Sequence, residues 1–169
     1  MNTKWWQGQT ASIIWTALRV WLGVQWIEAG WHKLVDGFDA TGFLHGAIGK
    51  ATGEFPAVQG WYAAFLENFA LPNVGLFNFL VPVGEVLVGL GLIFGLATVP
   101  ALLAGILMNW SFLMAGTVST NPMLLMAAVL LLFVGYGAYR YGLDRYAIPF
   151  IKEQWNNRNR KHNRPAHAH

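Results

Sequence analysis

The sequence predicts an all-α integral membrane protein, a four-helix bundle with short interfacial helices in its first external loop. Three observations lead to this fold class. The 169 residues are 55% hydrophobic and 11% charged, whereas about 25% of the residues of a soluble domain are charged. Four apolar segments each approach the ~20 residues that a helix needs to cross a bilayer. Seven of the eleven lysines and arginines follow the last apolar stretch, as expected of a chain end on the cytoplasmic side.

The four spans are predicted at residues 11–32, 77–96, 99–116 and 122–141. The first is too long for a signal peptide and is not followed by a small-residue cleavage site, so we expect it to remain in the mature protein. Only the sequence LATVP separates the second and third spans. Pro100 suits the first turn of a helix, so these two helices should form a tight antiparallel hairpin. Residues 1–146 are therefore assigned to one transmembrane domain.

An even number of spans puts both termini on one side of the membrane. That side holds Lys4 and the seven cations near the C-terminus, whereas the opposite loop holds Lys33 and Lys50. Both termini are therefore predicted to be cytoplasmic in a multi-pass protein of the cell membrane. The loop at residues 35–76 faces outward, and its apolar residues recur at helical spacing, which favours short interfacial helices. Residues 147–169 are predicted to be a disordered, basic cytoplasmic tail.

Two opposite charges, Arg19 and Glu85, fall near the middle of apolar spans, where a lone charge costs several kcal/mol. At ~100° per residue each shares a helix face with small residues that permit close helix packing, Gly30 on the first helix and Gly89 on the second. Asn109 lies at a similar depth on the third span, within roughly 5 Å of the predicted midplane. We hypothesise that Arg19, Glu85 and Asn109 meet in one buried cluster. A purely structural ion pair that fixes helix register is an equally good interpretation of Arg19 and Glu85.

A second polar stripe on the first helix contains Glu28 and His32, four residues apart. The pair could form a proton relay or half of a metal site, but hydrogen bonding at the interface is more common for residues near a helix end. The stripe could also be a subunit contact in a homo-oligomer. No metal or haem is expected, because the chain has no cysteine and no histidine deep in a span. The basic tail is interpreted as a topology signal beside the lipid bilayer, and no nucleic-acid partner is predicted.

The order of these motifs resembles the DoxX/DoxD family. The run RVWLGVQWIEAGWHKL is similar to the family's first-helix signature, with Arg19, Gly23, Gly30 and Lys33 at its spacing. VPVGEVLVGLGLIFGLAT resembles the second-helix motif around Glu85, and the NP of residues 121–122 and the GLDR of residues 142–145 fall where the family has them. The resemblance extends to about residue 146.

The resemblance implies a four-helix membrane protein like DoxD, the large subunit of a thiosulfate:quinone oxidoreductase that works with a small DoxA subunit. It implies oxidation of thiosulfate to tetrathionate, with electrons passed to membrane quinone and a DoxA-like partner. The alternative is a non-catalytic protein that organises a redox complex or carries a small lipophilic or anionic solute.

A mechanism can be assigned to the polar residues as a hypothesis. Arg19 would stabilise negative charge on a quinone head group and Glu85 would supply a proton, with Asn109 as a third member of the cluster. Glu28 and His32 would carry protons to the outer side, and Lys33 would meet an anionic sulfur substrate. The quinone would rest against apolar, glycine-rich walls, formed by Trp26, Gly30 and Gly89.

Overall fold

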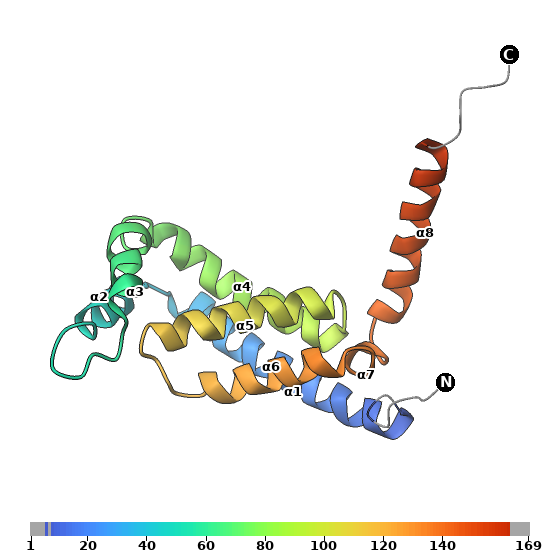
Figure 1. Ribbon diagram of the computed structural model, residues 1–169, viewed down its shortest axis with the longest axis horizontal. Helices are drawn as coiled ribbons and strands as arrows, with labels where there is room; N and C mark the ends of the chain where they lie inside the picture. The colour runs from blue at the N-terminus through green and yellow to red at the C-terminus, as the bar shows by residue number, and fades with distance from the viewer. Residues whose placement is uncertain (1–5, 7, 163–169) are drawn as a thin grey trace, which may run out of the picture.

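The computed structural model describes residue 6 and residues 8–162, with side chains described up to residue 158. These residues form helices and connecting segments without a strand, which confirms the all-α prediction. The elements in chain order are α1 (Gln9–Asp36), α2 (Thr41–Gly49), α3 (Gly60–Phe65), the π-helical η2 (Leu66–Ala70), α4 (Val74–Phe94), α5 (Thr98–Met114), α6 (Asn121–Val134), α7 (Tyr136–Tyr139) and α8 (Asp144–His162). Helices α1, α4, α5 and α6 form an elongated bundle, with α2 and α3 at one end and α8 leaving the other (Figure 1).

Helices α1 and α4 pack as an antiparallel pair in which glycines bring the two backbones together. A Cβ atom on Gly23 would lie 2.9 Å from the carbonyl oxygen of Gly89, and one on Gly30 would lie 2.9 Å from that of Pro82. Real Cβ atoms do not come so close to a backbone oxygen, so any side chain at these positions would push the helices apart. The predicted small-residue faces of both helices are therefore confirmed as their contact.

Two hydrophobic cores follow from this arrangement. The bundle core joins the inward faces of α1, α4, α5 and α6, and its buried members include Leu22, Trp26, Leu92, Leu102 and Leu131. A second core lies among α2, α3 and η2, which we call the cap (residues 40–70), and it is closed from the bundle side by Ala115. The segment predicted as an external loop with short helices thus folds around apolar residues of its own.

Three hydrogen bonds attach the cap to the bundle. The amide of Ala40 donates to Oδ1 of Asn78 on α4 at 2.8 Å. The Tyr62 hydroxyl donates to the carbonyl oxygen of Ser111 on α5 at 2.9 Å, and burial raises the pKa of this hydroxyl above its ordinary value. Nζ of Lys50 donates to the carbonyl oxygen of Gly116 at 3.0 Å. These bonds hold the cap over one end of α4 and α5.

The helix ends differ from the predicted spans at glycines with positive φ. Gly95 adopts φ +62° and ends α4 at Phe94, two residues earlier than predicted, and a three-residue turn then leads to α5, as expected for a hairpin. Gly135, also at φ +62°, ends α6. The prediction of one continuous helix over residues 122–141 is therefore wrong, because the left-handed backbone at Gly135 breaks the i to i−4 hydrogen bonds.

Within the described residues, α4 alone is both long and apolar enough to cross a membrane by length and composition. Helices α5 and α6 are apolar but have 17 and 14 residues. They would cover about 26 and 21 Å along their axes, short of the ~30 Å hydrocarbon core of a bilayer.

The C-terminal segment also differs from the prediction. Residues 147–162, expected as part of a disordered tail, continue α8 without a break. Low apolar content argues against burial but not against a helix, and this stretch contains two lysines, two arginines, one glutamate and one glutamine, all of which favour helices. Residues 163–169 and Lys4 lie outside the described part of the chain.

Candidate functional site

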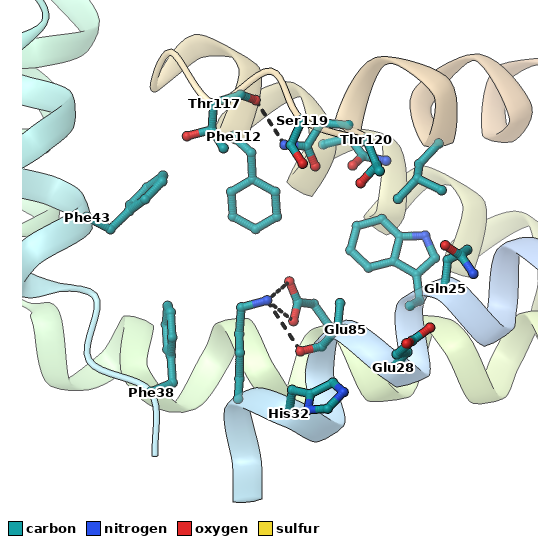
Figure 2. A pocket seen from close by; sticks show the side chains of 16 residues that line it. Gln25, Glu28, His32, Phe38, Phe43, Glu85, Phe112, Thr117, Ser119 and Thr120 are labelled. Atoms are coloured by element: carbon teal, nitrogen blue, oxygen red, sulfur yellow. Dashed lines mark hydrogen bonds and ion pairs between the residues drawn. The ribbon is translucent and has the colours of Figure 1, made fainter. Parts of the chain in front are cut away.

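A cavity of about 450 Å³ lies at the end of the bundle next to the cap. Its walls come from α1, α4 and α5, from the connection between α5 and α6, and from the cap. Figure 2 shows Glu85 on one side of the hollow, Phe112 and residues 117–120 on the other, and Phe38 and Phe43 on the side of the cap. The rings of Phe43 and Phe112 meet edge to face, with centroids 6.4 Å apart. The cavity therefore has an aromatic wall facing a charged one.

The charged wall is an ion pair between Lys33 of α1 and Glu85 of α4. Nζ of Lys33 donates to Oε1 of Glu85 at 2.9 Å and to Oε2 at 2.8 Å (Figure 2). Only 2% of the Glu85 side chain is exposed, compared with 28% of Lys33, so the pair connects the buried interior to the cavity. Nζ also lies 5.8 Å from the centroid of the Phe38 ring. These two contacts hold the ammonium group of Lys33 beside the space that a ligand would fill.

This pairing follows from the register of α1 and α4 and could not be predicted without it. The glycine contacts place Glu85 level with Ala29. Lys33 lies one turn further along α1, and because helical side chains lean toward the N-terminus, its ammonium group returns to this level and also contacts the carbonyl oxygen of Ala29 at 3.4 Å. The sequence predicts that Lys33 meets an anionic sulfur substrate, and it did not indicate the pairing with Glu85.

Arg19 lies elsewhere, so the predicted cluster of Arg19, Glu85 and Asn109 is wrong. The same register puts Arg19 level with Gly95, about 15 Å along the helix from Glu85. Nη2 of Arg19 donates to the carbonyl oxygen of Tyr141 at 2.8 Å, and the guanidinium group is packed against Gly95 and Gly142. Arg19 is 1% exposed and ties α1 to the turn between α4 and α5 and to the segment before α8.

Asp144 completes this second buried charge site. Its two carboxylate oxygens accept the amides of Ala97 and Thr98, each at 2.7 Å, which fixes the start of α5. Asp144 also interacts electrostatically with Arg19. Sequence reasoning missed Asp144, although it belongs to the GLDR motif, because that motif had no assigned partner.

Three of the predicted site residues carry buried polar atoms without a hydrogen-bond partner among the described residues: Arg19 at Nε and Nη1, Trp26 and Asn109. Asn109 is completely buried, and among the described residues neither its Oδ1 nor its Nδ2 has a hydrogen-bond partner. Nε1 of Trp26, a residue that is 2% exposed, also lacks one. Both residues line the cavity. Buried polar groups are nearly always satisfied, and each unsatisfied group costs about 1–3 kcal/mol, so the bundle end keeps polar groups that the fold itself does not use.

Glu28 and His32 both line the cavity from α1 and are exposed (Figure 2). Nδ1 of His32 lies 3.6 Å from Oδ2 of Asp36, one turn further along α1. The structure therefore pairs His32 with Asp36 and not with Glu28. Across the described residues no group of three or more histidines, aspartates or glutamates is placed to hold a metal ion.

Gly30 and Gly89 are not cavity walls, in contrast to the prediction. Both lie in the contact of α1 with α4, where an added Cβ would meet the backbone of the opposite helix. Their smallness is needed for packing. The missed wall residues are Phe38, Phe43 and Phe112, together with Ser119, Thr120 and Asn121. Their positions depend on how the cap and the connection between α5 and α6 fold, and the sequence carries no periodic signal for that.

Comparison with known proteins finds one matching family model. Residues 14–118 match the model of one protein family, described as DoxX. The match covers α1, the cap, α4 and α5, and so includes Lys33, Glu85 and Asn109. No curated protein and no solved structure matches the chain.

Proposed function

The chain belongs to the DoxX family and is a membrane protein, and we propose that it binds a membrane quinone as the DoxD-like subunit of an oxidoreductase. The observation that carries this proposal is the Lys33–Glu85 ion pair on the wall of a cavity that is also lined by four apolar aromatic side chains, Trp26, Phe38, Phe43 and Phe112. The volume of about 450 Å³ lies within the usual range of ~300–1,000 Å³ for small-molecule sites. Aromatic walls with a few placed polar groups suit a flat ring that carries carbonyl oxygens.

In this proposal α1, α4, α5 and the α6–α7 segment cross the membrane. The cap and the connection between α5 and α6 lie on the outer side, and the turn between α4 and α5 lies on the side of both termini. The cavity is then at the outer end of the bundle. This position replaces the midplane site expected from the sequence, and it puts the cavity within reach of both the bilayer and an external anionic donor.

The proposed chemistry joins two half-reactions. Two thiosulfate dianions lose two electrons as a sulfur–sulfur bond forms between them to give tetrathionate, and the quinone gains these electrons and two protons to become a quinol. Lys33 stabilises the negative charge that develops on a quinone oxygen. Glu85, whose carboxylate is paired with Lys33, takes up a proton that enters from the outer side and passes it to that oxygen. Glu28 and His32, exposed at the cavity edge, exchange protons with the outer side. A DoxA-like partner subunit supplies the surface at which thiosulfate reacts.

Asn109 adds a neutral hydrogen-bonding group to this site. Its buried and unpartnered amide can donate to a carbonyl oxygen of the quinone and accept from a hydroxyl of the quinol. One side chain can therefore bind both redox states, since an amide carries a donor and an acceptor. Arg19 was predicted to stabilise negative charge on the quinone. It has no role in this mechanism, because it lies at the other end of α1.

The test is quinone reduction by the purified protein in lipid nanodiscs, with thiosulfate and a short-chain ubiquinone, with and without the DoxA-like partner. We expect Glu85→Gln and Lys33→Gln to lower the rate by about 10²–10⁴-fold, the usual contribution of a positioned acid or charge. Glu67→Gln is the matched control, because Glu67 is an exposed cap residue outside the cavity. Full activity of correctly inserted Glu85→Gln protein would contradict the proposal.

A solute carrier or an organiser of a redox complex is the second candidate. Exposed Glu28 and His32 beside the cavity also offer a polar route for an anionic solute. Binding of the ubiquinone without any thiosulfate-dependent reduction, even with the partner present, would favour this alternative.

A further inference from the structure

Helix α8 has an apolar side that no other described element covers. Tyr146, Phe150, Ile151 and Trp155 are 71%, 63%, 62% and 66% exposed. At ~100° per residue these four lie on one half of the helix surface, which also carries the polar side chains of Gln154 and Arg158. An exposed aromatic stripe of this kind is unusual on a surface that faces only water.

The opposite side of α8 is polar and the helix is basic. Arg145, Lys152 and Asn156 lie within one narrow arc of the helix, and Arg158 follows the last apolar turn. Between residues 145 and 158 the helix carries three cations and one anion, Glu153, and the sequence continues with Arg160 and Lys161. A basic polar face opposite an aromatic face is typical of helices that lie in the headgroup region of a membrane.

The start of α8 is fixed at one end of the bundle. The amides of Leu143 and Asp144 donate to the carbonyl oxygens of Phe94 and Gly95 at 3.1 and 2.7 Å. The Asp144 carboxylate holds the first turn of α5. The first residues of α8 are therefore attached to the turn between α4 and α5, where these two helices end.

The direction of α8 completes the geometry. Figure 1 shows α8 running across the common direction of α4, α5 and α6, away from the bundle and at the end opposite to the cap. If the bundle crosses a bilayer, a helix that starts at its end and runs across its axis lies along the membrane surface.

We propose that α8 binds the cytoplasmic surface of the membrane, with its aromatic side in the interfacial region and its cations on anionic phospholipid headgroups. Burial of the four apolar side chains and attraction of the cations to an anionic leaflet act together. This surface is separate from the quinone site, and the inference depends only on the orientation of the bundle given under Proposed function.

Site-directed spin labelling tests the position of α8, because the natural chain contains no cysteine. Ile151→Cys and Lys152→Cys place labels on the two sides of α8, and the full-length protein is reconstituted in bilayers with one quarter phosphatidylglycerol. We expect oxygen, which concentrates in lipid, to reach the Ile151 label preferentially. We expect a water-soluble nickel chelate to reach the Lys152 label. Equal, water-like accessibility at both positions would overturn the proposal.

A control label separates failure of this proposal from failure of the membrane arrangement. Leu87 lies in the middle of α4 and is 62% exposed, so Leu87→Cys should report lipid if α4 spans the bilayer. A lipid signal at Leu87 with water signals on α8 would reject the surface helix alone. Water signals at Leu87 and on α8 would reject both.

The charge requirement is tested by lipid composition. In bilayers that contain phosphatidylglycerol, Lys152→Gln should lower the ratio of lipid-immersed to aqueous Ile151 label by about fivefold, since each cation contributes about 1 kcal/mol near an anionic surface. Pure phosphatidylcholine should abolish this difference. An identical ratio in both lipids would contradict headgroup binding, and protection of the label from both oxygen and nickel would show that a second copy covers the helix instead.

Discussion

Each end of the bundle holds two opposite charges, of which Glu85 at one end and Arg19 and Asp144 at the other are buried, and the surroundings of these charges differ. Lys33 and Glu85 border a cavity that also contains the unpartnered amide of Asn109. The guanidinium group of Arg19 is enclosed by Gly95, Gly142 and the Tyr141 carbonyl, near Asp144. A buried charge is therefore not by itself evidence of a site. The space next to it distinguishes the end that is available for a ligand from the end that connects helices.

The largest effect is expected from filling the glycine beside Arg19. Gly95→Ala should lower the free energy of unfolding by about 2–5 kcal/mol, from a left-handed backbone and an overpacked contact. Gly95 has φ +62°, and its Cβ would overlap the Arg19 guanidinium. The measurement is unfolding of the detergent-solubilised protein by increasing mole fractions of dodecyl sulfate.

Gly84→Ala is the matched control for this substitution. A Cβ at Gly84 would lie 3.5 Å from Sδ of Met108, an ordinary contact, and Gly84 is inside α4. This variant should be up to about 1 kcal/mol more stable than the natural protein, because alanine favours a helix. Equal stability of the Gly95→Ala and Gly84→Ala variants would contradict the structural role assigned to the contact between Arg19 and Gly95.

The next effect compares two asparagine side chains, Asn109, which has no hydrogen-bond partner among the described residues, and Asn78, which has one. Asn109→Leu should raise the free energy of unfolding by about 1–3 kcal/mol by removing unsatisfied polar atoms, and should weaken binding of the short-chain ubiquinone about tenfold. Both quantities can be measured on one preparation, by dodecyl sulfate unfolding and by fluorescence titration.

Asn78 provides the opposite case for the same substitution. Its Oδ1 accepts the amide of Ala40 at 2.8 Å, so Asn78→Leu should lower the free energy of unfolding by about 1–3 kcal/mol. Quinone affinity should not change, because Asn78 is outside the cavity wall. Changes of the same sign in both variants would mean that Asn109 is satisfied in the folded protein and does not serve a ligand.

The smallest effect concerns the cap and its response to pH. Asp39 accepts hydrogen bonds from the Thr41 hydroxyl and amide and from Asn78, and these bonds lower its pKa below the ordinary value of about 3.8. Its contribution to the folded cap is therefore present at neutral pH and is lost as the pH falls below that value. Hydrogen exchange of α2, corrected for intrinsic rates, should accelerate in this range. Asp39→Asn should abolish the acceleration, and an unchanged pH profile would show that these bonds do not hold the cap.

The helices could be predicted because each carries its own signal. The apolar runs gave α1, α4 and α5 to within a few residues, and the helical spacing in residues 35–76 indicated the short helices of the cap. Gly135 was not recognised as a break because glycines are also common within apolar helices, as at Gly89 and Gly91 of α4. A positive φ angle depends on what surrounds the residue.

Part of the cavity wall is made of residues that the sequence singled out, but their arrangement was not predicted. Glu85, Asn109, Trp26, Glu28, His32 and Lys33 all line the cavity, and each was selected from its type and helix face. Arg19 was grouped with Glu85 because depth was estimated from the ends of separate spans. An antiparallel register can differ from that estimate by several residues, and each residue moves a side chain by about 1.5 Å.

The sequence by itself determined which residues form helices, which faces are buried and which family the chain resembles, because these depend on local periodicity and residue type. Tertiary structure alone decided that Glu85 pairs with Lys33, that Arg19 lies beside Gly95 and that the Asn109 amide has no hydrogen-bond partner among the described residues. Those outcomes depend on how far two helices slide past each other. The glycine contacts between α1 and α4 fix this relative position, which cannot be read from the sequence of either helix alone.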